Sequence, residues 1–218
     1  MLNIKLSGSR CYQQLIATDD ASSAIKLMTP NPDATQQEPL PLTLTQSESI
    51  STLISGIQDV TDSLSGEGFS LSQIMQMIME TMYRALPGTR VLLALRDKTR
   101  GAYIGKYGFG KNIDQLKEHF ALPLTYNPDL FNLALKNAAD IKIDSISNPK
   151  IQSKLPEWYH KKINATSFLL YPVVMKKTPV ALIYIDSQQA ANIALTENQL
   201  MLLKTLRNQA ILALKNLN

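Results

Sequence analysis

The stretch FLLYPVVMKKTPVALIYID, which spans residues 168–186, contains the strongest fold signal in this chain. Two apolar runs flank a short basic turn at residues 176–179, a pattern typical of a β-hairpin. In the second run both faces of the strand are apolar, with Val180, Leu182 and Tyr184 on one face and Ala181, Ile183 and Ile185 on the other. We therefore predict a central strand that is covered on both sides.

A long amphipathic helix follows this hairpin. Thr196 and Gln199 form a capping-box pattern at its start, and apolar residues occur on more than one side of residues 196–217. A helix of this kind has to bury two faces. Residues 44–64 show a further helical stripe, and Ser70 with Gln73 predicts the start of another helix.

The middle of the chain alternates short strand and helix signals. Residues 91–95 and 102–107 indicate a hairpin around a turn at 97–101, and a polar helix is expected at about 112–119. A short strand at 121–125 precedes a helix capped by Asn127. This order predicts an α+β domain with a central antiparallel sheet and helices on both sides.

The first 46 residues differ from the rest. They contain four prolines among serine, threonine, glutamine and aspartate, with one short helical pattern at Asp20–Met28. We predict a flexible tail or linker at 1–46, or the remnant of an upstream domain, followed by one folded domain at 47–218.

Composition narrows the class of protein. Residues 1–66 carry three basic and seven acidic side chains, and residues 67–218 carry 19 basic and 11 acidic ones. A basic half can attract nucleic acid, but no recognition helix is evident, so nucleic-acid binding is not favoured over a lysine-rich solvated surface. No apolar run has the roughly 20 residues of a membrane span, and the N-terminus lacks the apolar core of a signal peptide. We expect a cytoplasmic protein without membrane contact.

Candidate catalytic groups are few. Cys11 is the single cysteine, and the two histidines, His119 and His160, have no metal-ligand spacing. Scattered acids at Asp140, Asp144 and Asp186 do not define a catalytic pair. We predict no catalytic residues, no metal site and no enzymatic activity, and the sequence identifies no cofactor.

Three segments resemble the GAF domain, a sensory and dimerising module. These are the hairpin at 168–186, the closing helix LTENQLMLLKTLRNQAILAL, and the segment ALPLTYNPDLFNLALKNAADIKIDSI. The resemblance covers about Gly68 to Leu217. The family's cyclic-nucleotide signature is not found, and Cys11 lies outside the region in which the bilin-binding and methionine-sulfoxide-reducing branches carry their cysteines.

The resemblance implies a non-catalytic regulatory domain in signal transduction that binds a small molecule, dimerises, or does both. It implies a homodimer formed through helices 47–64 and 196–217. The alternative is a protein-docking scaffold whose pocket is filled by its own side chains. The ligand site implied by the resemblance contains Tyr107, Phe109, Asn127, Phe131, Asp144 and Tyr171, although residues of the aromatic type more often belong to a plain core.

Overall fold

The computed structural model of this protein describes residues 44–66, 68–189 and 195–216. A compact unit extends over Thr43–Asn218. The predictions of a tail at 1–46 and of a short helix at Asp20–Met28 fall almost entirely outside the described residues. The domain boundary at residue 47 therefore stays a prediction.

The described elements follow the predicted order of helices, hairpin, mixed segment, hairpin and helix. They are α2 (Gln46–Ser65), α3 (Leu71–Ala85), β1 (Thr89–Asp97), β2 (Ala102–Phe109), α4 (Ile113–His119), β3 (Ala121–Pro123), α5 (Leu130–Asn137), β4 (Ile141–Ile143), α6 (Pro149–Gln152), α7 (Glu157–Lys162), β5 (Ser167–Met175), β6 (Thr178–Ser187) and α8 (Glu197–Asn216).

One six-stranded antiparallel sheet forms the centre of the domain, in the order β3-β2-β1-β6-β5-β4. Strand β6 lies between β1 and β5 and is buried on both faces from Ala181 to Ile185. The predicted α+β class and the predicted central strand are confirmed. The β5–β6 turn has two residues, Lys176 and Lys177, and both adopt left-handed backbone conformations, with φ of 48° and 65°, which non-glycine residues rarely do.

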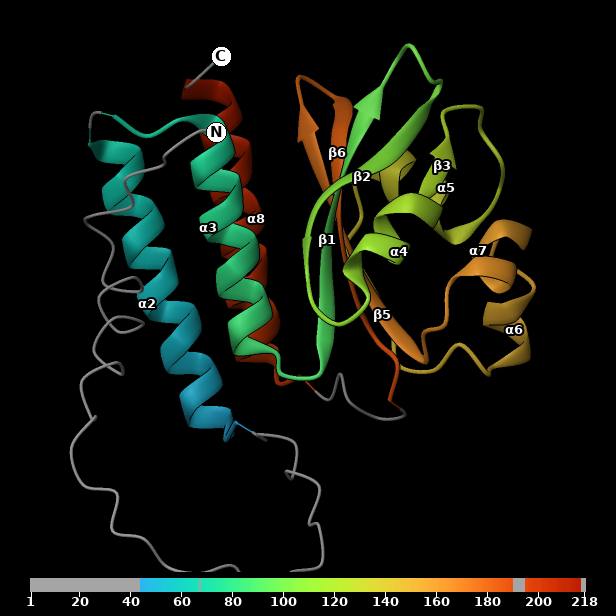
Figure 1. Ribbon diagram of the computed structural model, residues 1–218, viewed down its shortest axis with the longest axis horizontal. Helices are drawn as coiled ribbons and strands as arrows, with labels where there is room; N and C mark the ends of the chain where they lie inside the picture. The colour runs from blue at the N-terminus through green and yellow to red at the C-terminus, as the bar shows by residue number, and fades with distance from the viewer. Residues whose placement is uncertain (1–43, 67, 190–194, 217–218) are drawn as a thin grey trace, which may run out of the picture. The chain divides into compact units, whose positions relative to one another are not determined.

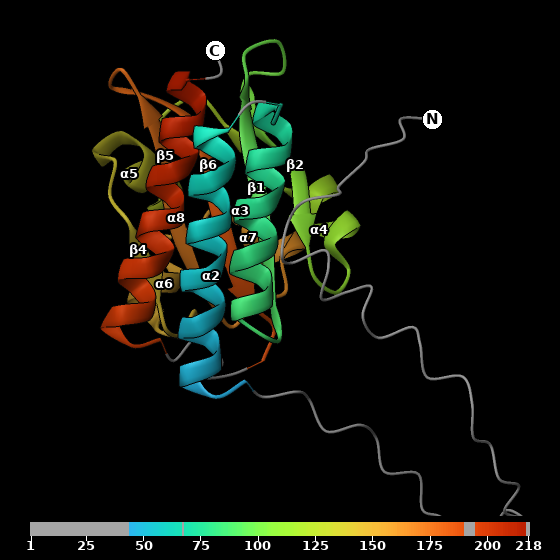
Figure 2. The ribbon, with the colours of Figure 1, turned by 90° about the vertical axis from the view of Figure 1, so that its left-hand side faces the viewer.

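The two faces of the sheet are covered by different sets of helices (Figure 1). Helices α3 and α8 pack on one face, and α2 packs against both of them on the side away from the sheet (Figure 2). The other face is covered by the shorter helices α4 to α7 (Figure 1). Each face has its own hydrophobic core, so the sheet separates two clusters of buried side chains.

The close contact of α2 and α3 depends on a glycine. A Cβ atom on Gly56 would lie 2.2 Å from the Thr81 side chain, which is far below any real carbon contact. Glycine inside a helix ordinarily only lowers its stability. The structure shows instead that the missing side chain is what lets the two helices approach.

One local prediction is wrong in detail. The cap of α5 is Asp129, whose carboxylate accepts from the backbone N–H of Asn132 at 2.8 Å, and it is not Asn127, which lies exposed in the preceding loop. The segment 148–162 forms α6 and α7 and buries Tyr159 completely. None of the helices in the described part of the chain combines the length and hydrophobicity that a membrane crossing requires.

Candidate functional site

A charged pair is buried on the sheet face that α4 to α7 cover. Asp186, at the end of β6, is fully buried, and Arg90, in β1, is almost so. The pairing of β1 with β6 places the two residues opposite each other. The Arg90 Nε atom donates to Asp186 Oδ1 at 2.8 Å, and its Nη2 atom donates to Oδ2. Two parallel bonds of this kind hold both groups in one orientation.

Two tyrosines extend this pair into the core. The Tyr184 hydroxyl donates to Asp186 Oδ2 at 2.7 Å, and it lies 3.0 Å from the Tyr159 hydroxyl. Burial raises the pKa of both tyrosine hydroxyls, so both stay protonated at neutral pH. Burial also raises the pKa of the Asp186 carboxyl, and the hydrogen bond from Arg90 opposes this rise.

Aromatic rings fill the space around these polar groups. Phe120, Phe131 and Tyr184 have ring centroids 5.2–6.3 Å apart, and all three are fully buried. Phe131 also stacks on Phe168, with ring centroids 5.7 Å apart, and packs against Trp158, with ring centroids 5.6 Å apart. This face therefore has a polar network enclosed by rings of the chain itself.

The predicted ligand residues do not converge on this network. Phe131 is part of the aromatic core, whereas Asn127 and Asp144 are exposed at its margin. The Asp144 carboxylate pairs with Lys142 at 2.8 Å. Of these three residues, only Phe131 contacts the buried rings.

The other three predicted ligand residues are Tyr107, Phe109 and Tyr171. They lie on the face of the sheet that α3 and α8 cover. Phe109 stacks on Tyr83 of α3 at 5.9 Å, and Tyr171 belongs to the core beneath α8. Tyr107 is 44% exposed, and its hydroxyl lies 3.5 Å from that of Ser72. The six residues thus occupy both faces, and the ligand site stays a prediction.

Sequence reasoning did not single out Arg90 or Tyr159. A signal for the network was present, because Asp186 and Tyr184 share one face of a strand that is otherwise apolar on both sides. A carboxylate in such a position needs a buried cationic partner. The sequence did not show which of the basic residues would supply it.

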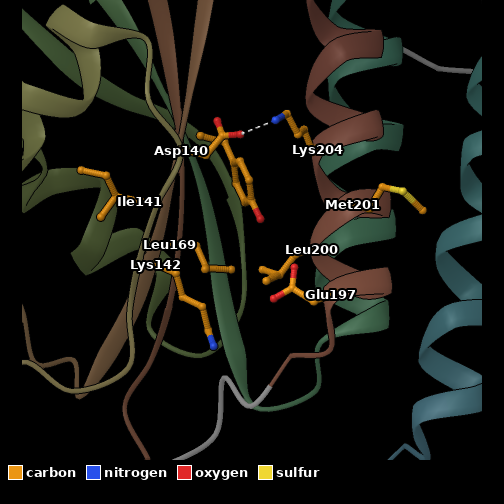
Figure 3. A pocket seen from close by; sticks show the side chains of 9 residues that line it. Asp140, Ile141, Lys142, Leu169, Glu197, Leu200, Met201 and Lys204 are labelled. Carbon is orange, nitrogen blue, oxygen red and sulfur yellow. Dashed lines mark ion pairs between the residues drawn. The ribbon is translucent and has the colours of Figure 1, made fainter.

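A groove lies between α8 and the β4–β5 edge of the sheet, with a volume of about 390 Å³ (Figure 3). Leu169 and Tyr171 of β5 and Leu200 of α8 form its apolar lining. Charged side chains stand at its ends, with Lys142 and Glu197 at one end and Asp140 and Lys204 at the other (Figure 3). Its volume falls within the usual range of small-molecule sites.

Several solved structures have a fold similar to that of this chain. A GAF domain from an Acinetobacter phosphoenolpyruvate-protein phosphotransferase superposes with a TM-score of 0.58 at 18% identity, covering 76% of this chain and 92% of its own. Residues 122 to 287 of a methyl-accepting chemotaxis protein superpose with a TM-score of 0.57 at 16% identity. The match covers 75% of this chain and 98% of that one. The fold is that of a GAF domain. No family model matches the sequence, and no curated protein matches it either.

A third GAF-like neighbour corrects one prediction. A free methionine-R-sulfoxide reductase from Neisseria meningitidis, solved with its substrate, gives a TM-score of 0.57 at 11% identity and covers 80% of this chain and 93% of its own. The structure of reduced fRMsr of Staphylococcus aureus is also similar, with a TM-score of 0.54. The prediction that this chain is not an enzyme is therefore wrong, because proteins with the same fold include enzymes.

Proposed function

We propose that this chain is a regulatory GAF-type domain of signal transduction, which dimerises through α2 and α8 and responds to a small molecule. Support for the signalling role comes from the fold and from the neighbours that are parts of a phosphotransferase and a chemotaxis protein. The observation that carries the proposal is the way α2 and α8 are held together.

Two glutamines of α8 fix its register against α2. The Gln199 amide donates to Ser49 Oγ at 2.8 Å, and the Gln209 amide donates to Thr61 Oγ1 at 2.7 Å and to the Ile57 carbonyl at 3.0 Å. Residue numbers rise together along both helices, so the helices are parallel. Because buried hydrogen bonds resist sliding, a displacement of α8 moves α2 with it.

The outer surface of this helix pair retains apolar side chains. Ile54 is 44% exposed, Met201 is 60% exposed and Leu212 is 46% exposed. A second copy that laid the same two helices against these would cover them in a four-helix bundle. A shift of α8 in one protomer would then reach the partner and any segment joined to the helices.

Sedimentation velocity of the full chain at micromolar concentration tests the dimer. We expect a dimer for the natural sequence and a monomer for Leu212→Glu, because a carboxylate cannot be buried unpaired at an interface. Tyr126→Glu is the matched control, since Tyr126 is 50% exposed and lies far from α8 in the sequence, in the loop before α5. A monomeric natural chain would overturn the proposed dimer.

One observation favours a docking scaffold as the second candidate. The sheet face under α4 to α7 is filled by the chain's own aromatic rings, as the prediction of a self-filled pocket requires. A thermal-shift screen with nucleotides, haem, bilins and small organic acids separates the candidates. A stabilising ligand supports the sensor, and a partner that binds without any such ligand supports the scaffold.

A further inference from the structure

The charges of the groove between α8 and the β4–β5 edge are arranged with opposite signs at its two ends. At one end the Asp140 carboxylate lies between two cations, 3.2 Å from Arg207 and 3.7 Å from Lys204. This end has a net positive charge. At the other end, Lys142 is already paired with Asp144, and Glu197 adds a second carboxylate, so that end has a net negative charge.

Several polar groups at the groove have no partner in the described part of the chain. The Glu197 carboxylate makes no hydrogen bond or ion pair there, and it faces the groove in Figure 3. The Tyr171 hydroxyl likewise makes no hydrogen bond, although the residue is only 4% exposed and lines the groove. The hydroxyl oxygen itself is accessible from the groove, so its proton is available to a ligand there.

The Tyr171 hydroxyl is held in its donor form. Burial raises its pKa, and the nearby Asp140 carboxylate raises it further. The hydroxyl therefore stays protonated and is suited to an anionic acceptor. Lys204 is 58% exposed and only loosely paired with Asp140, which leaves ammonium protons for the same acceptor.

The distance between the two ends selects the length of a ligand. Glu197 and Lys204 are seven residues apart on α8, which corresponds to about 10 Å at 1.5 Å per residue. An extended peptide spans about 3.3–3.6 Å per residue, so three residues cover about 10 Å. Leu169 and Leu200 lie between the charged ends and offer apolar surface to a central side chain.

We propose that this groove binds a short peptide of about three residues with free termini. The peptide carboxylate accepts hydrogen bonds from Tyr171 and Lys204, and the peptide ammonium pairs with Glu197. This inference deepens the sensory role proposed above by naming a ligand class. Because the ligand lies between α8 and the sheet, its binding acts directly on the helix that is coupled to α2.

Calorimetric titration of the full chain with alanyl-leucyl-alanine tests the inference. We expect binding in the sub-millimolar range, and a loss of about tenfold in affinity for both the N-acetylated peptide and the C-terminal amide, in line with one charged hydrogen bond each. Equal binding of all three peptides, or no binding of any, overturns the proposal.

Variants assign the two ends separately. Glu197→Gln should weaken the free peptide about tenfold and leave the N-acetylated peptide unchanged. Tyr171→Phe keeps the ring and should weaken the free peptide more than the amide, because a carboxylate accepts a stronger hydrogen bond than an amide oxygen does. Glu157→Gln is the matched control, since Glu157 is an exposed carboxylate in the first turn of α7 and lies on the other face of the sheet.

The dimer measurement keeps this inference separate from the proposed function. A dimer that fails to bind the peptides overturns the groove proposal alone. A monomer that binds them with the expected pattern overturns the proposed dimer alone. Affinities that Glu197→Gln and Tyr171→Phe do not change would place the peptide elsewhere and overturn the assignment of the groove.

Discussion

Replacing Asp186 with asparagine isolates the energetic role of the buried ion pair. The substitution keeps the shape of the side chain and removes its charge, which leaves the Arg90 guanidinium buried without a counter-charge. Removing one partner of a buried pair destabilises proteins by about 3–5 kcal/mol. For a chain of this size that corresponds to a fall in Tm of about 6–20 °C.

The converse change, Arg90→Met, should be less severe. Burial already raises the pKa of Asp186, and without Arg90 nothing opposes that rise as strongly, so the carboxyl left behind takes up a proton more readily. The folded state then holds a proton that the unfolded state releases at lower pH. The stability that this proton contributes to Arg90→Met is therefore complete below the ordinary carboxyl pKa and is lost as pH rises through the raised pKa of Asp186.

Urea unfolding followed by Trp158 fluorescence measures these effects. Trp158 is the single tryptophan and packs 5.4 Å from Phe120, inside the aromatic core that surrounds the pair. The double variant Arg90→Met with Asp186→Leu removes both charges and should lie within about 2 kcal/mol of the natural chain. The reasoning is refuted if Asp186→Asn costs less than about 1 kcal/mol, or if the double variant loses the sum of the single losses.

Four further predictions, three substitutions and one titration, test other parts of the structure. Gly56→Ala should destabilise by about 1–2 kcal/mol in urea unfolding despite its better helix propensity, because the new methyl overlaps Thr81; a gain in stability would contradict the close contact. Lys177→Gly should stabilise by about 1 kcal/mol, since glycine accepts the left-handed turn, and a loss would contradict the turn geometry. Gln199→Leu should cost about 1–2 kcal/mol and speed amide exchange in α2; unchanged exchange would argue against coupling of the two helices. Hydrogen bonds from Thr45 lower the pKa of Glu48, so NMR titration should place it below 4.5, and the helix-capping contribution should disappear as pH falls through that pKa.

Local signals predicted the elements because the physics behind them is local. The capping boxes at Ser70 and Thr196 appear as predicted, since a side chain that bonds a backbone N–H three residues away needs no tertiary partner. The β5–β6 hairpin was predictable for the same reason. Asn127 failed as a cap because several polar residues precede α5, and packing of the helix decided that Asp129 takes this position.

Alternation and helical periodicity were enough to predict a doubly covered central strand and two flanking helices, because these patterns reflect burial one element at a time. The residues that meet across long stretches of chain depend instead on how the elements assemble. Gln199 illustrates both kinds of contact. Its side-chain oxygen Oε1 accepts from the Thr196 backbone N–H and caps α8, as the sequence predicted. Its side-chain Nε2 group donates to Ser49 Oγ, 150 residues away. Arg90 and Asp186 are likewise 96 residues apart, and their pairing depends on the β1–β6 register. The groove under α8 also depends on this assembly, because its charged ends come from segments that no local pattern joins.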